Sequence, residues 1–180
     1  MTRLLPRRIG WRGATFGLVM AALGLGLGIG EPTGITGLDE YWHSMRTALQ
    51  SFETQAWFIP QLDGEPRIQK PPLFYWMMML SFEAFGVDFW SARLPALLFG
   101  VIFAATIGML YRVLFCSGGT LAFMISLSLL TVAVESRRAM LDLPLATCVA
   151  LTVLFALLAM RGRGTMAYLF PAVLALAAGF

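Results

Sequence analysis

The chain has 180 residues, of which 58% are hydrophobic and only 13% are charged, and its formal net charge is +3. Soluble domains carry roughly 25% charged residues, so this composition excludes an ordinary soluble domain. The apolar runs are long and continuous rather than alternating, which excludes a transmembrane β-barrel and favours membrane-crossing helices. The positive charge comes mainly from arginines, and it indicates contact with lipid headgroups rather than nucleic acid.

These apolar runs predict an all-α integral membrane protein with about five transmembrane helices. A helix needs about 20 apolar residues to cross the hydrocarbon core of a bilayer. We predict spans at residues 14–30, 94–114, 121–134, 143–160 and 166–180. The third and fifth spans are short, and the chain ends inside the fifth. We therefore expect residues 1–180 to be the N-terminal part of a larger multi-span domain.

The distribution of charge predicts how these spans are oriented. With a cytoplasmic N-terminus, the cytoplasmic segments contain no acidic residue, and their positive charges are Arg3, Arg7, Arg8, Arg12, Arg112, Arg161 and Arg163. All ten acidic residues then lie on the other side. This asymmetry follows the positive-inside rule, so we predict a cytoplasmic N-terminus. A cleaved signal peptide is the competing interpretation of residues 1–30, but no small-residue cleavage site stands out there.

The first loop, residues 31–93, is far longer than a simple connection between helices. Its many aromatic residues argue against a solvated coil. An apolar stripe at helical spacing predicts an amphipathic helix that can lie along the membrane surface; its members are Tyr41, Met45, Leu49 and Phe52.

A second short helix is expected after Pro71 and Pro72, because proline suits the first turn of a helix, where its missing N–H needs no partner. This second helix is apolar on all sides, which fits packing at the membrane interface. An extended stretch, residues 58–69, joins the two juxtamembrane helices. The first loop is therefore predicted to be ordered and to lie on the non-cytoplasmic side.

Two adjacent acids, Asp39 and Glu40, follow the first span. Ionisable groups at membrane depth are costly and tend to mark function. A structural role also explains them, since Asp39 can cap the juxtamembrane helix while Glu40 occupies its first turn, where the helix dipole favours negative charge. The two roles are compatible, because a capping site also fixes the position of a carboxylate.

Three further charged residues have both a structural and a functional interpretation. Lys70 either reaches from the interface towards lipid headgroups or places its ammonium on a phosphate. Asp142 precedes Pro144 and either starts a helix or joins Asp39 on the same face of the membrane. Arg138 opposes the positive-inside trend and needs a partner, which Glu135, Asp142 or an anionic substrate could supply.

The remaining polar residues give weaker signals. His43 is the only histidine of the chain, and it is either structural or a ligand or base. Cys116 and Cys148 are interpreted as small packing residues rather than a disulfide or a metal site. No phosphate-binding glycine loop and no serine triad is present, so a soluble hydrolase or nucleotide enzyme has no support.

Several sequence motifs, taken together with their order and spacing along the chain, resemble the N-terminal part of the GT-C glycosyltransferases that use polyprenyl-phosphate sugars. The resemblance is strongest to the aminoarabinose transferases that modify lipid A and to the related protein O-mannosyltransferases. The motifs span about residues 38–146: Leu38-Asp39-Glu40-Tyr41-Trp42, Trp57-Phe58-Ile59-Pro60 with Asp63-Gly64, Lys70-Pro71-Pro72-Leu73-Phe74-Tyr75-Trp76, Phe85-Gly86-Val87, Ser91-Ala92-Arg93-Leu94-Pro95 and Arg138-Ala139-Met140-Leu141-Asp142-Leu143-Pro144-Leu145-Ala146.

The resemblance implies a site and a reaction. Asp39 would be the catalytic acidic group with Glu40 in support, Asp142 would be the second acid of the cavity, and Lys70 would contact the lipid phosphate. Arg138 is assigned to substrate binding. The implied activity moves a sugar from a polyprenyl-phosphate donor to a lipid or protein acceptor, with inversion of the anomeric centre.

The resemblance also implies a cellular location, and it does not decide whether the site uses a divalent metal. The expected location is the bacterial inner membrane, with the first loop in the periplasm and membrane lipids as partners. Gln69 stands where the aminoarabinose branch often has an acidic residue. No cofactor is therefore assigned, and a divalent metal stays open. The alternative function is a non-catalytic membrane-embedded interaction protein or an inactive remnant.

Overall fold

The computed structural model describes residues 24, 26–30, 40–68, 70–161 and 171. The described elements are a π-helical segment η1 (Glu40–Met45), the helices α3 (Arg46–Glu53), α4 (Leu73–Phe85), α5 (Phe89–Phe115), α6 (Gly119–Ser128), α7 (Leu130–Glu135) and α8 (Asp142–Met160), and the strands β1 (Gln61–Leu62) and β2 (Glu65–Pro66). Asp39, most of the predicted first span and nearly all of the predicted fifth span lie outside the described residues.

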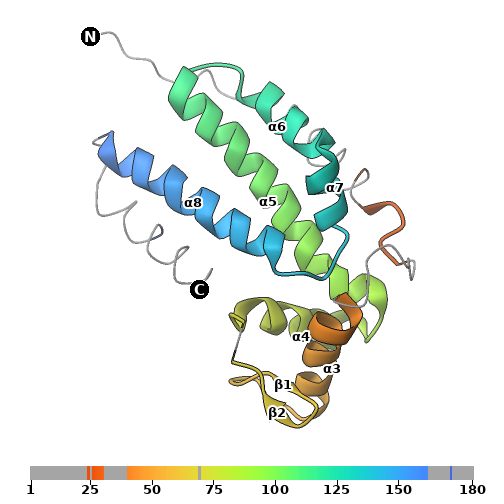
Figure 1. The fold of residues 1–180 in the computed structure, drawn as a ribbon. Helices are drawn as coiled ribbons and strands as arrows, with labels where there is room; N and C mark the ends of the chain where they lie inside the picture. The colour runs from red at the N-terminus through yellow and green to blue at the C-terminus, as the bar shows by residue number, and fades with distance from the viewer. Residues whose placement is uncertain (1–23, 25, 31–39, 69, 162–170, 172–180) are drawn as a thin grey trace.

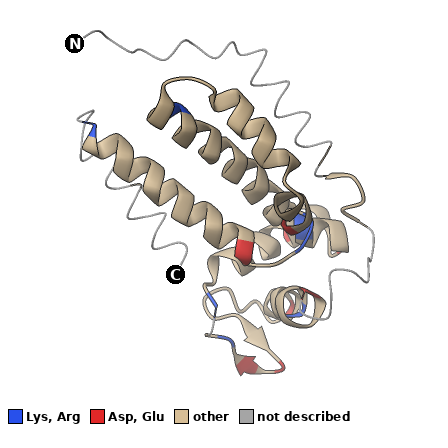
Figure 2. Ribbon diagram, turned by 45° about the horizontal axis from the view of Figure 1, so that its top comes forward, with Lys and Arg blue, Asp and Glu red and all other residues tan. Residues whose placement is uncertain are grey.

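The long helices form a bundle, and the first loop packs at one end of it. In Figure 1, α5 runs between α8 on one side and α6 and α7 on the other, while α3, α4 and the two strands gather at its lower end. The bundle helices carry few charged residues along their length (Figure 2). Helix α5 has 27 residues and α8 has 19, and both are long and apolar enough to cross a membrane. They correspond to the predicted spans at residues 94–114 and 143–160.

Helix α5 begins earlier than the predicted span because a capping box starts it. The Asp88 carboxylate accepts a hydrogen bond from the Phe89 N–H at 2.6 Å, and the Ser91 hydroxyl accepts one from the Asp88 N–H at 3.0 Å. Pro95 lies inside the helix and cannot donate to the Ser91 carbonyl. The Ser81 hydroxyl of α4 donates to that carbonyl at 2.6 Å instead, which ties α4 to the start of α5.

The predicted third span differs from the structure. We predicted one helix at residues 121–134, whereas the chain forms α6 and α7 with a break at Leu129, whose ψ of 126° is extended. Just before the break, the Ser126 and Ser128 hydroxyls bond to the carbonyls of Ala122 and Ile125. Such side chains compete with the backbone ladder and bend helices. The count of five spans stays a prediction.

The first loop folds into the two predicted helices with a short hairpin between them. The hairpin pairs Gln61 with Pro66 and Leu62 with Glu65. Its turn residues, Asp63 and Gly64, have φ values of 56° and 81°. Two positive φ angles in succession are what a tight two-residue hairpin turn requires. The predicted extended stretch is therefore a β-hairpin at its centre.

The apolar stripe predicted for the first juxtamembrane helix is only partly buried. Met45 is buried as expected, but Tyr41 is 51% exposed, and the buried neighbours include Ser44 and Thr47. The cause is the π-helical segment η1. In a π-helix the backbone hydrogen bonds join residues five apart instead of four, so the side chains point in directions that differ from regular α-helical spacing.

One hydrophobic core joins the first loop to the bundle. It contains side chains from η1, α3, α4, α5, α8 and the turn before α8, namely Met45, Ala48, Phe74, Tyr75, Met78, Phe82, Ala92, Ala96, Phe99, Ala139 and Cys148. This shared core fixes the first loop on the end of the bundle. It also sets the position of the polar residues at the junction.

Candidate active site

A cavity of about 80 Å³ lies where the first loop meets the bundle. Lys70 and Asp142 both line it, although they come from distant parts of the chain, and both side chains are exposed at its edge. The other lining residues are mostly apolar: Pro71, Leu73, Phe74, Phe99, Leu141, Pro144, Leu145 and Cys148. The cavity thus combines one cationic and one acidic group with an apolar wall.

The position of Lys70 is set by the start of α4. Pro72 takes helical backbone angles and accepts a hydrogen bond from the Trp76 N–H at 3.0 Å, so the helix begins directly after the two prolines. The Trp76 indole N–H donates to the Trp57 carbonyl across the loop. These contacts hold the segment that carries Lys70 against α4.

Asp142 is the first residue of α8. The helix begins there because the Leu145 N–H already donates to the Leu141 carbonyl, at 2.9 Å. The Asp142 carboxylate lies in the first turn of α8, where the helix dipole favours an acid. Asp142 therefore starts the helix, as the structural interpretation expected, and its side chain also faces the cavity.

Glu40 is buried and fully engaged. Its side chain is 2% exposed, and Oε1 accepts hydrogen bonds from Arg93 Nε at 2.8 Å and from the Ala139 N–H at 2.7 Å. Arg93 Nη2 donates to the other oxygen, Oε2, at 3.2 Å. These contacts favour a supporting role for Glu40 over direct contact with a substrate. Its assignment to the catalytic group stays a prediction.

Arg93 was not assigned to the site from sequence. Its side chain is 3% exposed, and besides Glu40 it donates through Nη1 to the Ile29 carbonyl at 2.8 Å. The guanidinium also lies over the Phe89 ring, 5.7 Å from the centroid. One feature of the sequence could have pointed to Arg93, namely its position at the start of an apolar span with Glu40 expected at the same end of the bundle. Charged side chains are almost never fully buried unless they are paired with an opposite charge.

Arg138 forms an ion pair with Glu135, one of the three partners predicted for it. Its Nη1 donates to Glu135 Oε1 at 3.0 Å, one helical turn earlier. Among the described residues, the cavity lining that contains Lys70 and Asp142 does not include Arg138. The structure thus brings Lys70 and Asp142 together and places Arg138 on the neighbouring turn. Its role in substrate binding stays a prediction.

Asp39 lies outside the described residues, but Glu40 directly follows it in the chain. His43 is exposed on the surface of η1. Within residues 40–68 and 70–161, no group of three or more His, Cys, Asp or Glu side chains gathers that could hold a metal ion.

Tyr75 lies in α4, close to Arg67 of the hairpin, and its side chain is only 1% exposed. Burial raises the pKa of the Tyr75 phenol, and the hydrogen bond and charge of Arg67 partly oppose that rise. The phenol therefore stays neutral at physiological pH. Tyr75 is therefore a buried, uncharged polar side chain between α4 and the loop.

Comparison with known proteins places the chain in a family. Residues 69–180, more than half of its length, match the model of the family described as dolichyl-phosphate-mannose-protein mannosyltransferase. The chain belongs to this family. The match covers Lys70 and Asp142, and it confirms the resemblance inferred from the motifs. No curated protein sequence matches the chain.

Two solved structures have a similar fold. The chain is 21% identical to ArnT from Cupriavidus metallidurans in the apo state, with a TM-score of 0.71 over 92% of this chain and 32% of that one. It is 22% identical to the same protein bound to undecaprenyl phosphate, with a TM-score of 0.68 over 93% and 30% of the two chains. The chain thus spans about a third of the length of these structures. Together with the two long apolar helices, the family and the fold make it a membrane protein.

Proposed function

We propose that this chain carries the donor end of a glycosyltransferase site that moves a sugar from a polyprenyl-phosphate donor to a lipid or protein acceptor. The observation that carries the proposal is the junction cavity, where Lys70 and Asp142 meet beside an apolar wall. A polyprenyl-phosphate sugar has the matching chemistry, since it joins an anionic phosphate to a hydrocarbon chain. Membership of the mannosyltransferase family and the likeness to a protein bound to undecaprenyl phosphate support it.

The size of the cavity limits which part of the donor it can hold. Pockets that bury a whole drug-sized ligand measure about 300–1,000 Å³, several times the volume found here. The described residues therefore enclose room for little more than the phosphate of the donor. The hydrocarbon chain would lie outside the cavity, among apolar side chains and lipid.

The reaction assigns one task to each charged group. In a single displacement, the acceptor oxygen forms a bond to the anomeric carbon while the bond from that carbon to the phosphate oxygen breaks. Asp39 takes the proton of the acceptor, and the electron pair of the broken bond leaves with the phosphate. The Lys70 ammonium stabilises the charge that develops on the phosphate. Asp142, as the second acid, orients the acceptor or the sugar, and the product has inverted configuration.

The membrane arrangement follows from the same proposal. The sugar is transferred on the non-cytoplasmic side, with the N-terminus in the cytoplasm and the first loop in the periplasm of a bacterial inner membrane. Contact between Glu40 and Ala139 supports one part of this proposal, that the first loop and the turn before α8 lie on the same side of the membrane.

Transfer activity tests the proposed function. In the protein that carries these residues, Asp39→Asn removes the base and is expected to lower kcat by about 10²–10⁴-fold. Lys70→Gln is expected to lower it by about 10²–10³-fold, the loss typical of one stabilising donor at a developing charge. Asp142→Asn should also lower the transfer rate. The assay measures sugar transfer from a defined polyprenyl-phosphate donor by membranes or purified protein.

Matched controls remove the same charges elsewhere in the first loop. Arg46→Gln and Glu65→Gln change side chains outside the cavity lining, and they should keep activity within about twofold. Wild-type rates for both Lys70→Gln and Asp39→Asn would contradict the proposal. That result would favour the alternative function, a non-catalytic membrane-embedded interaction protein.

A further inference from the structure

We propose that Glu40 and Arg93 form a positioning clamp that fixes the turn before α8, and with it the proposed site residue Asp142, against the first loop. The clamp consists of these two side chains and the two backbone groups they bind, the Ile29 carbonyl and the Ala139 N–H. This inference rests on the proposed function and deepens it. Neither residue of the clamp needs to touch the donor or the acceptor.

The clamp joins three segments that are far apart in the chain. Glu40 belongs to the first loop, Arg93 to the start of α5, and Ala139 to the turn before α8. Asp39 is bonded directly to Glu40, and Asp142 follows Ala139 by less than one helical turn. Because the Ala139 N–H is bonded to the Glu40 carboxylate, a shift in that carboxylate displaces the backbone that leads into Asp142.

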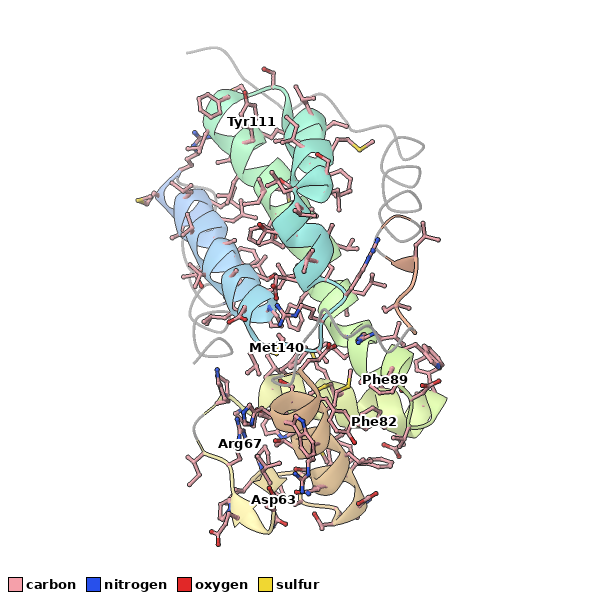
Figure 3. The ribbon with its side chains drawn as sticks, turned by 45° about the vertical axis from the view of Figure 1, so that its right-hand side comes forward. Asp63, Arg67, Phe82, Phe89, Tyr111 and Met140 are labelled. Atoms are coloured by element: carbon pink, nitrogen blue, oxygen red, sulfur yellow. The ribbon has the colours of Figure 1, made fainter. Side chains whose placement is uncertain are left out.

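Other contacts keep the turn before α8 against the N-terminal segments. Arg137 Nη2 donates to the Gly24 carbonyl at 2.6 Å, and the Ser44 hydroxyl of η1 contacts the Met140 sulfur at 3.8 Å. Figure 3 places Met140 at the boundary between the bundle and the first loop. The turn is thus held from the first-span side, from η1 and from α5. The clamp adds to these contacts the Glu40 carboxylate, which binds both the Ala139 N–H of the turn and Arg93 of α5.

Burial and geometry explain why the clamp must be a Glu with an Arg. Both side chains are at most 3% exposed, and a buried ion pair adds little net stability compared with apolar groups of similar volume. Its distinctive contribution is direction, because the planar guanidinium holds both carboxylate oxygens with fixed donors. Glu40 must also be an acceptor for the Ala139 N–H. A lysine or an apolar pair can fill the space but cannot reproduce these directions.

The first test replaces the directional contact and keeps the charge. In the protein that carries these residues, Arg93→Lys should lower kcat by about 10–100-fold, since a displacement of about 1 Å can cost 10²-fold. The KM for the polyprenyl-phosphate donor should change by less than about threefold, because Lys70 lies outside the clamp. Rates are normalised to folded protein, measured as the monodisperse peak in detergent. A wild-type kcat in the folded fraction would overturn the proposal.

The second test separates positioning from stability. The double variant Glu40→Leu with Arg93→Met replaces the clamp by apolar side chains of similar size, which often preserves folding. The proposal expects a folded protein whose kcat stays at least tenfold below that of the wild type. A folded double variant with full kcat would overturn it. If the double variant does not accumulate, Arg93→Lys decides the matter.

Matched controls lie in the same loop. Arg46 and Asp63 form an exposed ion pair at its outer edge, so Arg46→Lys and Asp63→Asn should leave kcat within about twofold. Failure of the clamp is distinct from failure of the proposed function. If Lys70→Gln and Asp39→Asn abolish transfer while Arg93→Lys does not lower kcat, only the clamp is wrong. If all of these variants transfer sugar normally, the proposed function is wrong as well.

Discussion

Two ion pairs in and beside the first loop show how burial decides what a charge does. At the junction with the bundle, Glu40 and Arg93 are 2% and 3% exposed and bind backbone groups from two further segments. At the outer edge of the loop, Arg46 and Asp63 are 35% and 57% exposed and link η1–α3 to the hairpin turn. The first pair links the loop to two other segments inside the packed junction. The second is a solvated contact within the loop.

The largest expected effect comes from breaking the junction pair. Arg93→Ala leaves the buried Glu40 carboxylate without its cation, which typically costs about 3–5 kcal/mol. Thermal or denaturant unfolding of the purified protein in detergent measures the loss. A cost below about 1 kcal/mol would show that the two pairs do not differ in the way that burial predicts.

A smaller effect is expected where the turn before α8 touches α5. A methyl group added at Gly100 would lie 2.1 Å from the Ser136 hydroxyl oxygen, so Gly100→Ala must push the turn away. Overpacking of this kind costs about 1–3 kcal/mol. Gly26→Ala is the control, because a methyl group there meets no atom within 4 Å. Equal stability of the two variants would contradict the tight packing of the junction.

A third prediction concerns the carbonyl that Pro95 leaves without a helical partner. Ser81→Ala removes its substitute donor and should destabilise the protein by about 1 kcal/mol. Pro95→Ala restores a backbone N–H that can donate to the same Ser91 carbonyl. The loss caused by Ser81→Ala should therefore shrink in the Pro95→Ala background. An unchanged loss in a double-mutant cycle would rule out this compensation.

The smallest effect is expected at the outer ion pair. Asp63→Asn should change the free energy of unfolding by about 0.2–1 kcal/mol, because exposed pairs are weakened by water and salt. Unfolding at low and high ionic strength measures the effect, which should fade as salt is added. A loss of stability above about 2 kcal/mol that does not depend on salt would show that this exposed pair contributes as a buried pair does.

Much of the fold was predictable because hydropathy and proline act locally. The two long helices, the short helix after Pro72 and the ordered first loop all follow from apolar runs, aromatic content and turn residues in the sequence. The pairing of Lys70 with Asp142 in one cavity came from the family resemblance. Spacing alone favoured a structural explanation for each residue, and in the structure Asp142 both starts α8 and lines the cavity.

The features that were missed depend on contacts between distant segments. The pairing of Arg93 with Glu40 needs the packed junction, and no local pattern specifies it. The break at Leu129 and the rotation of Tyr41 out of the core are departures from regular helix geometry, and an apolar run of the same composition fits a continuous helix equally well. The periodicity of apolar residues therefore predicted where the helices lie, but not where their backbone geometry is irregular.

Direct binding of a polyprenyl phosphate tests the central claim, that the junction cavity receives the donor phosphate. Affinity of undecaprenyl phosphate is measured for the purified wild-type protein, for Lys70→Gln and for Arg46→Gln, which removes the same charge from the outer edge of the loop. A charge-assisted contact to a phosphate is worth about 1.5–3 kcal/mol, so Lys70→Gln should raise Kd by at least about tenfold. Arg46→Gln should leave Kd within about twofold. Equal affinities for Lys70→Gln and the wild type would contradict the assignment of this cavity.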